Sequence, residues 1–329
     1  MDERTPIFVL TGFLGSGKST LLSACVREAE MDRTAVIVNE FGEVGLDHLL
    51  VTKGGEDTIL LDSGCLCCLS NSQVQDTLLI LHARRKRGEI SFDRVVIETS
   101  GLAEPGPMLR PLMVDAFVQR NFRLAGVTAT ADAQLAVEQL ARYEEARHQV
   151  ACADRLVITK CDIAASEAID QAKAAIRLLN PAADIALSPA ERSAADILGF
   201  GDVSDDVNVV ALDDEGAGTD HTYNRHVHNH SSGIDSFVLW FDSPVSWAGY
   251  AQWLEKVREI DGRQLLRTKG LLWFDDGELR LVQGVQHSFS SPKAFDGHAE
   301  RSFLVMIVQD VERDVLQRIA ENLIGTHSS

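Results

Sequence analysis

The sequence lacks both a membrane-spanning segment and a surplus of basic residues. No apolar run approaches the roughly 18 residues that a transmembrane helix needs. Lys and Arg number 31 against 49 Asp and Glu, so the formal net charge is −18 with His counted as neutral. Such an acidic chain repels phosphate backbones and anionic lipids, which argues against nucleic-acid and membrane partners. The opening MDERTPIFVL carries no secretory signal pattern, and we expect a cytoplasmic protein.

The sequence has one group of closely spaced cysteines and lacks a second. Three of the six, Cys65, Cys67 and Cys68, fall within four residues, and no other pair has zinc-ribbon spacing. In a reducing compartment such a cluster indicates metal or redox chemistry rather than disulfides. A closed four-thiolate site does not fit, whereas two or three thiolates completed by a carboxylate, His, water or a client protein suit metal transfer. A redox pair and three small buried side chains are the alternatives.

Short apolar runs alternate with helical stretches through the first part of the chain. Continuous apolar runs separated by helices predict βαβ units and a mostly parallel sheet with helices on both faces. We therefore expect residues 1–200 to form one α/β domain. The expected strands are residues 7–10, 35–38, 59–61, 95–97, 125–129 and 156–158.

An acidic segment separates this part from the rest. Between Ser193 and Asn224 there is no Lys or Arg but there are eight Asp or Glu, in a stretch rich in Gly and Ser. We interpret residues 201–232 as a linker. Residues 233–329 hold all four Trp and predict a smaller C-terminal α/β domain, with a hairpin turn at residues 275–277 (DDG). Its expected strands are 236–241, 271–274, 279–283 and 303–308, and its expected helices are 247–260 and 311–323.

Residues 12–19 (GFLGSGKS) fit in full the phosphate-loop pattern G-x-x-x-x-G-K-[ST], between a predicted strand and a predicted helix. Glycines let backbone N–H groups point at phosphate oxygens. Lys18 reaches the β- and γ-phosphates, and Ser19 offers its hydroxyl to Mg²⁺. The fold class is then that of a P-loop NTPase, and a Gly-rich turn without function is the alternative. The predicted nucleotide-binding residues here are Gly12, Gly15, Ser16, Gly17, Lys18, Ser19 and Thr20.

The run E-T-S-G places Glu98 at the end of a predicted buried strand. P-loop enzymes keep at this point the carboxylate that holds Mg²⁺ or orients the attacking water. We therefore predict that Glu98 acts in catalysis together with Lys18, and that the Gly101 N–H senses the γ-phosphate. A helix cap supplied by Thr99 or Ser100 is the alternative.

A second acidic segment, Glu40–Asp47, follows the predicted strand 35–38. Acids next to a strand end suggest a switch segment that responds to the nucleotide. A solvated loop is the alternative, because acidic residues are common in loops.

Residues 159–162 (TKCD) follow another predicted buried strand and resemble the guanine-recognition pattern N-K-x-D. The Asp162 carboxylate can accept hydrogen bonds from both donors of the guanine edge, which adenine lacks. The aliphatic stem of Lys160 would cover the base plane. We predict that Thr159, Lys160 and Asp162 contact the base, and a surface loop is the alternative.

Four histidines lie in the predicted linker. Neutral imidazoles suit zinc, nickel, copper and cobalt, so weak metal capture is one interpretation and a solvated linker is the other. The residues are His221, His226, His228 and His230.

Several of these segments occur together in one known family. TGFLGSGKSTLL, NEFGEVGLD, GCLCC, ETSGLAEPGP and TKCD resemble the G-domain signatures of the CobW family of GTPases. KGLLWFDD and VQGVQHSF resemble its C-terminal domain, so the resemblance covers most of the chain. It implies a P-loop GTPase with a metal at G-C-x-C-C that is positioned by the nucleotide state. Family members are linked to Zn²⁺ supply or insertion, and others to Co²⁺ for cobalamin or to nitrile hydratase activation.

The resemblance also implies roles for single residues. It assigns phosphate and Mg²⁺ to the phosphate loop, guanine to Lys160 and Asp162, and the transition metal to the three clustered cysteines. Thr159 is a departure, because many members have Asn there. The lost side-chain amide is expected to weaken selectivity for GTP.

We therefore expect a GTP-hydrolysing metallochaperone with GTP, Mg²⁺ and Zn²⁺ (or Co²⁺) as its ligands. It would deliver the metal to a client metalloprotein under GTP/GDP control. Intrinsic hydrolysis is expected to be slow, because the motifs show no evident arginine finger. The alternatives are a regulatory P-loop GTPase with a structural zinc, a cobalt chaperone for cobalamin synthesis, and a non-enzymatic metal buffer. The sequence leaves the client and the oligomeric state open.

Overall fold

The computed structural model describes residues 4–38, 59–62, 71–188, 193–200, 224–227 and 233–324. The chain divides into two compact units, one of residues 1–175 and 184–203 and one of residues 176–183 and 204–329. No helix within the described ranges combines the length and the apolar character that a membrane span requires.

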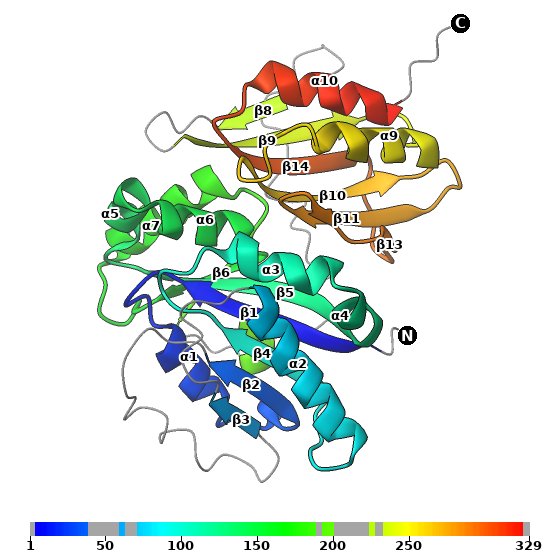
Figure 1. Cartoon of the computed structure of the whole chain (residues 1–329). Coiled ribbons are helices and arrows are strands. Elements are labelled where there is room, and N and C mark those ends of the chain that lie inside the picture. The colour runs from blue at the N-terminus through cyan, green and yellow to red at the C-terminus, as the bar shows by residue number, and fades with distance from the viewer. Residues whose placement is uncertain are drawn as a thin grey trace, which may run out of the picture. The chain divides into compact units, whose positions relative to one another are not determined.

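The first unit is built on a seven-stranded sheet in the order β3-β2-β4-β1-β5-β6-β7, and all neighbouring strands run parallel (Figure 1). The predicted parallel α/β fold is confirmed. Its strands are β1 (Thr5–Gly12), β2 (Thr34–Val38), β3 (Ile59–Asp62), β4 (Arg94–Glu98), β5 (Phe122–Asp132), β6 (Arg155–Thr159) and β7 (Asp184–Leu187). Its helices are α1 (Lys18–Cys25), α2 (Asn71–Lys86), α3 (Pro105–Val114), α4 (Ala116–Asn121), α5 (Ala136–Arg142), α6 (Glu144–Cys152), α8 (Ala194–Leu198) and the part of α7 (Ser166–Leu179) that precedes residue 176.

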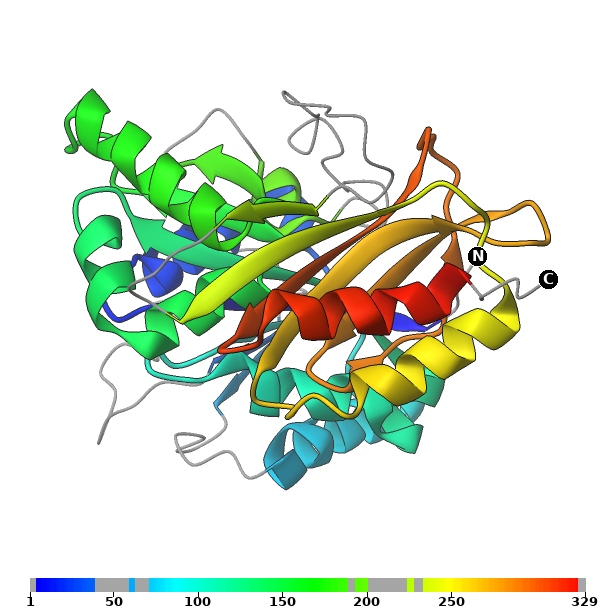
Figure 2. The ribbon, with the colours of Figure 1, turned by 90° about the horizontal axis from the view of Figure 1, so that it is seen from above.

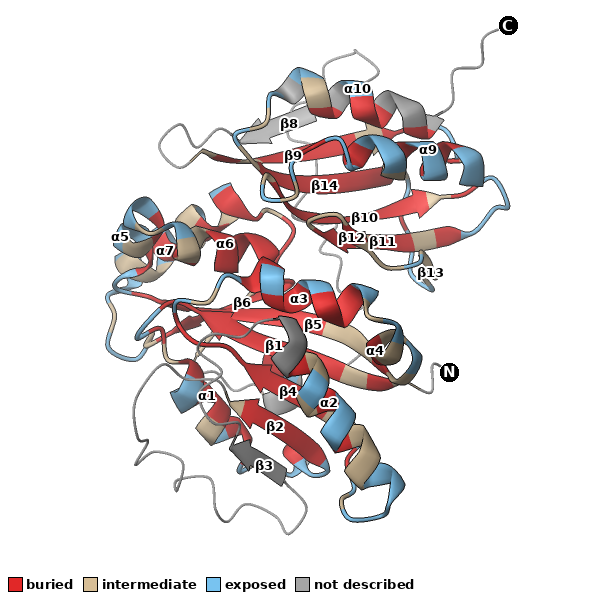
Figure 3. Cartoon of the chain, viewed as in Figure 1, coloured by how far each residue is buried: buried red, intermediate tan, exposed pale blue. Residues whose placement is uncertain are grey.

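Strand β1 shows why the apolar runs are continuous rather than alternating. Residues 7–10 are all buried, because helices cover both faces of the sheet (Figures 1 and 3). On one face Phe8 and Leu10 pack with Leu21 of α1 and Ile197 of α8. Helix α6 contacts β1 and helix α3 contacts β5 on the opposite face.

The parallel order brings the carboxyl ends of four neighbouring strands to one edge of the sheet. Strand β1 ends at Gly12, β4 at Glu98, β5 at Asp132 and β6 at Thr159. In open α/β sheets ligands bind outside this edge. The fold therefore gathers the phosphate loop, the E-T-S-G run and the TKCD segment at one place.

The second unit is an antiparallel sheet in the order β12-β11-β10-β14-β9-β8, with β13 paired to β11. Helices α9 and α10 lie side by side across the strands (Figure 2). The predicted C-terminal α/β domain is confirmed. Its strands are β8 (Asn224–Val227), β9 (Ile234–Phe241), β10 (Leu265–Trp273), β11 (Leu279–Val285), β12 (Ser288–Phe289), β13 (Lys293–Ala294) and β14 (Ser302–Gln309), and its helices are α9 (Trp247–Val257) and α10 (Arg313–Ile324).

The core of this unit is aromatic. Trp253 of α9 is fully buried, its indole ring lies 5.7 Å from the ring of Tyr250, and Phe289 meets it edge-on at 5.4 Å. The predicted hairpin joins β10 to β11, and Gly277 has φ +83° in its turn. The DDG turn is thus confirmed by a backbone conformation that favours glycine.

Strand β8 falls inside the segment interpreted as a linker. It pairs antiparallel with β9, from Asn224 opposite Leu239 to Val227 opposite Ser236. The linker interpretation is therefore wrong for residues 224–227. Polarity and the shortness of the run conceal the strand, because an edge strand needs only one neighbour and one covered face.

Candidate nucleotide site

The phosphate loop follows β1 and leads directly into α1, as its sequence pattern predicts. Gly12, Gly15 and Gly17 have φ of 140°, 71° and 91°, conformations that side chains with a Cβ rarely adopt. A Cβ on Gly12 would lie 2.6 Å from the carbonyl oxygen of Thr130 on the neighbouring strand. The glycines are therefore needed for the path of the loop and for its close approach to β5.

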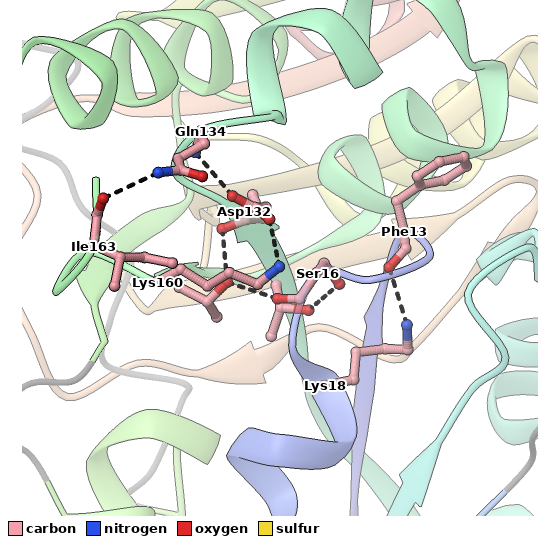
Figure 4. A network of polar contacts seen from close by, with 10 residues as sticks. Phe13, Ser16, Lys18, Asp132, Gln134, Lys160 and Ile163 are labelled. Carbon is pink, nitrogen blue, oxygen red and sulfur yellow. Dashed lines mark hydrogen bonds and ion pairs between the residues drawn. The ribbon is translucent and has the colours of Figure 1, made fainter. Parts of the chain in front are cut away.

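Lys18 is buried inside the curve of this loop. Its Nζ donates to the carbonyl oxygen of Gly12 at 2.8 Å. It also donates to that of Phe13 at 3.1 Å (Figure 4). The ammonium is thus held where the loop can present it to a bound phosphate.

Ser19 and Glu98 come together although 79 residues separate them in the chain. The Ser19 hydroxyl donates to the Glu98 Oε1 at 2.6 Å, and Glu98 is buried at the end of β4. A hydroxyl and a carboxylate oxygen are the hard ligands that Mg²⁺ accepts, so this pair fits a Mg²⁺ site beside the phosphate loop. Thr20, the next predicted residue, is exposed at the surface of α1.

The E-T-S-G run packs directly on the phosphate loop. The Thr99 N–H donates to the Leu10 carbonyl oxygen at 2.9 Å, and a Cβ on Gly101 would lie only 2.8 Å from the backbone nitrogen of Leu14. Gly101 is therefore in close contact with both the backbone and the side chain of Leu14 in the phosphate loop. Helix α3 begins only at Pro105 with Glu104 as its N-cap, so the alternative of a cap from the E-T-S-G run is wrong.

Gln149 of α6 fixes the other side of this segment. Its Nε2 donates to the carbonyl oxygens of Gly101 and Ala103, both at 3.1 Å, and the residue is buried. The sequence motifs do not reveal Gln149, because it lies in an ordinary helix 48 residues further along the chain. It ties α6 to the segment that faces the phosphate loop.

The TKCD segment is joined to the phosphate loop by its first residue. The Thr159 hydroxyl donates to the Ser16 carbonyl oxygen at 2.6 Å, and Thr159 is buried. The Ser16 hydroxyl lies 2.6 Å from the Thr130 hydroxyl, so its side chain faces β5 (Figure 4). Thr159 thus links the TKCD segment directly to the phosphate loop. Asp162 is exposed two residues after Lys160.

The other predicted metal and switch residues lie outside the described part of the chain. These are Glu40–Asp47, Cys65, Cys67, Cys68, His221, His228 and His230, together with the side chain of His226, whose backbone belongs to β8. Within the described ranges no group of three or more His, Cys, Asp or Glu could hold a metal ion. The predictions on these residues stay predictions.

Two of the described cysteines, Cys25 and Cys161, are free thiols that favour the protonated form. Burial raises the pKa of Cys25 to about 12, and it also raises the pKa of Cys161. The Cys161 Sγ contacts the Ile158 carbonyl oxygen at 3.2 Å. A protonated, buried thiol is a poor metal ligand, which leaves the predicted metal chemistry to the clustered cysteines.

Comparison with known proteins agrees with this architecture. Residues 6–186 match the CobW/HypB/UreG nucleotide-binding domain, and residues 234–324 match the cobalamin synthesis protein CobW C-terminal domain. The chain belongs to the CobW family. This CobW protein therefore contains both domains that its sequence motifs indicate.

Relatives of this CobW protein carry names that refer to zinc. It is 33% identical over 291 residues to the zinc chaperone YjiA of Escherichia coli, a match that covers 87% of each chain. It is 27% identical over 364 aligned positions to the zinc-regulated GTPase metalloprotein activator 1 of Schizosaccharomyces pombe, covering 94% of this chain and 84% of that one. The crystal structure of Zn(II)-bound YjiA GTPase from E. coli superposes with a TM-score of 0.70 at 27% identity, covering 97% of this chain and 99% of that one.

Proposed function

We propose that this CobW protein is a GTPase metallochaperone. It binds GTP at the phosphate loop and hydrolyses it to GDP and phosphate. It carries a transition metal, with zinc as the first candidate, on Cys65, Cys67 and Cys68, and it delivers this cargo to a client metalloprotein. Free thiols among the described cysteines suit the reducing cytoplasm, where we place the protein.

The proposal of GTP hydrolysis is supported mainly by the hydrogen bond between Ser19, which follows Lys18 in the phosphate loop, and the buried Glu98. Ser19 and Glu98 would hold Mg²⁺, which when bound neutralises charge on the β- and γ-phosphates. Lys18 binds the same phosphate oxygens, and the backbone N–H groups of the loop orient them. The contact between Gly101 and Leu14 lets the E-T-S-G run respond to the γ-phosphate.

The chaperone part is supported by the relatives and by the position of the cysteines in the chain. The similarity to a zinc chaperone extends over 87% of this chain. The cysteine cluster stands between β3, which ends at Asp62, and α2, which starts at Asn71. Strand β3 belongs to the same parallel sheet as β1, so both end at the phosphate-binding edge. Helix α2 has no acidic residue in its first turn, so its N-terminus favours thiolates in front of it.

The metal assignment is tested by removing two thiols together. Cys67→Ser combined with Cys68→Ser should lower zinc affinity by at least about a hundredfold, because each thiolate–zinc bond contributes strongly, and should leave GTP affinity unchanged. Zinc affinity is measured by competition with a chromogenic chelator, and GTP affinity with a fluorescent analogue. Cys161→Ser is the matched control, since a hydroxyl can keep the contact with the Ile158 carbonyl and should leave zinc affinity unchanged. Full zinc affinity in the double variant would contradict the assignment.

The four histidines at residues 221–230 form a separate part of this proposal. We assign them a weaker, accessory role in metal capture, since neutral imidazoles bind the same metals. Replacing all four with Asn should lower the number of weakly bound zinc ions and leave the tight site unchanged. Loss of the tight site in that variant would instead make them ligands of the cargo.

A further inference from the structure

A buried carboxylate that no sequence motif contains lies next to the TKCD segment. Asp132 is the last residue of β5, and its side chain is only 2% exposed. Its Oδ2 accepts a hydrogen bond from the Lys160 Nζ at 2.6 Å, and its Oδ1 accepts one from the Gln134 N–H at 2.8 Å (Figure 4). Both carboxylate oxygens are therefore engaged in holding neighbouring segments.

Lys160 needs such a partner because its backbone and its side chain are both constrained. Its φ is +58°, a left-handed conformation that is costly for a residue with a Cβ. Its side chain is 38% exposed, so without an anchor the ammonium could turn to water and the long stem would sample many rotamers. The ion pair with Asp132 selects one direction for the stem.

A second tie runs through Gln134. Its side-chain Nε2 donates to the Ile163 carbonyl oxygen at 3.0 Å, while its backbone is held by Asp132 (Figure 4). The loop after β5 is thus connected both to Lys160 and to the residue that follows Asp162. Residues 160–163 are therefore held at both ends, by the buried Asp132 carboxylate at Lys160 and by the Gln134 amide at Ile163.

We propose that Asp132 is a positioning residue for guanine recognition, which it performs by fixing Lys160 and, through Gln134, the loop that carries Asp162. The inference rests on the proposed function, because it assumes that this segment reads the base of GTP. Asp132 itself does not touch the nucleotide in this proposal. It arranges the Lys160 stem and the Asp162 carboxylate before GTP binds, so less ordering is required on binding.

Asp132 should affect the binding of the base and not the binding of the phosphates. The phosphate loop holds its own lysine through the Gly12 and Phe13 carbonyls and does not use Asp132. Loss of the carboxylate should therefore weaken the binding of the base while leaving the binding of the phosphates intact. A residue with only a structural role would lower the affinity for all nucleotides alike.

The test compares GDP and ADP in the full-length protein. The affinity of each is measured by displacement of a fluorescent GDP analogue from wild type and from Asp132→Asn. We expect the variant to bind GDP about tenfold more weakly, as for the loss of one charge-assisted hydrogen bond, and to bind ADP within about twofold of wild type. The preference for GDP over ADP should therefore fall about tenfold.

The matched control is Asp93→Asn, which removes an aspartate from an exposed ion pair with Arg33 in the same unit. It should leave both affinities unchanged. Lys160→Met keeps an apolar stem but removes the ammonium, so combining it with Asp132→Asn should weaken GDP binding by less than the product of the two single effects.

If Asp132→Asn does not fold, a milder variant tests the same inference. Gln134→Ala keeps the backbone N–H that Asp132 accepts and removes only the bond to Ile163, so it should lower the GDP preference by about threefold. An unchanged GDP preference in a folded Asp132→Asn protein, or in Gln134→Ala if the first variant does not fold, overturns the inference alone. A wild-type protein that does not distinguish GDP from ADP overturns it together with the proposed GTP specificity.

Discussion

The two sheets of this protein treat their buried polar groups in different ways. At the carboxyl edge of the parallel sheet, buried carboxylates bond to more exposed side chains, as in the Ser19–Glu98 and Lys160–Asp132 pairs. Beneath α9 and α10, by contrast, the Tyr250 hydroxyl and the Trp253 indole N–H are single polar atoms on large rings. Neither of these atoms has a hydrogen-bond partner among the described residues.

This difference in hydrogen bonding distinguishes a sheet edge suited to ligand binding from a core that serves only packing. A connected set of hydroxyls and carboxylates is costly to bury unless each member has a partner, so its presence at one edge points to ligand binding. The aromatic core of the second unit gains its stability from packed area, and it tolerates two unbonded polar atoms. Burial raises the pKa of Tyr250, which keeps its hydroxyl neutral. Substitutions in the two sheets should therefore affect different properties.

The largest effect is expected in the aromatic core. Trp253→Ala should lower the free energy of unfolding by about 3–5 kcal/mol, because it leaves a cavity among Tyr250, Phe289 and their neighbours. Denaturant unfolding followed by tryptophan fluorescence and circular dichroism measures it. GTP affinity of the folded fraction should not change. Trp253→Phe, the control, keeps a ring in the core and should cost much less, and an equally large loss would contradict the cavity explanation.

The next effect concerns the phosphate end of the site. Glu98→Gln keeps the size of the side chain but replaces the carboxylate, which accepts the hydrogen bond from Ser19, with a neutral amide. GTP hydrolysis should therefore slow by about 10²–10³-fold. Single-turnover release of phosphate measures the rate, and the unfolding midpoint should stay close to that of wild type. Hydrolysis at the wild-type rate would remove Glu98 from the catalytic machinery.

A smaller effect is expected where the base end joins the phosphate end. Thr159→Val has nearly the same shape but lacks the hydroxyl that donates to the Ser16 carbonyl at 2.6 Å. GTP affinity should fall by about 1 kcal/mol, or roughly fivefold, because the Ser16 carbonyl loses a buried donor. Thr159→Ser should restore binding, and calorimetric titration with a non-hydrolysable GTP analogue distinguishes the two variants. Equal affinities for Val and Ser would show that the hydroxyl is not needed.

The smallest effect is a pH dependence in the second unit. Hydrogen bonding from Arg280 lowers the pKa of Asp276 from 3.8 to about 2. A carboxyl with a lowered folded-state pKa contributes stability above its unfolded-state pKa and loses it as the pH falls through the folded-state value. Asp276→Asn should therefore have a slightly lower melting temperature than wild type at pH 5, and this gap should close between about pH 4 and pH 2. A gap that stays constant with pH would contradict this.

The sequence predicts the residues of the phosphate loop well, because their chemistry requires both identity and spacing. Glycines at residues 12, 15 and 17 have the positive φ that the pattern requires, and Glu98 ends a buried strand, as the sequence predicts; its hydrogen bond with Ser19 is seen only in the structure. The order of the strands is what a single sequence does not contain. Strand β5 lies beside β1, and α6 packs against both strands. Only this arrangement brings Thr130, Asp132 and Gln149 to the site.

Polar residues inside strands explain two further differences. The apolar pattern predicts a strand at 125–129, whereas β5 continues to Asp132. It predicts a strand at 271–274, whereas β10 begins at Leu265 and includes the buried Arg267 and Lys269. Charged side chains interrupt the apolar signal even where tertiary contacts bury them, so the apolar pattern predicts strands that are too short.

Delivery of the metal under GTP/GDP control, as we expect from the sequence, requires that the binding of nucleotide and the binding of metal be coupled. We would measure the Zn²⁺ affinity of the full-length protein by competition with a chromogenic chelator. One titration would contain Mg²⁺ and a non-hydrolysable GTP analogue, and the other would contain GDP. The account predicts affinities that differ by about tenfold or more, or at least about 1.4 kcal/mol of coupling, with a matching effect of Zn²⁺ on nucleotide affinity. Equal Zn²⁺ affinities in the two states would contradict it and would indicate a structural zinc.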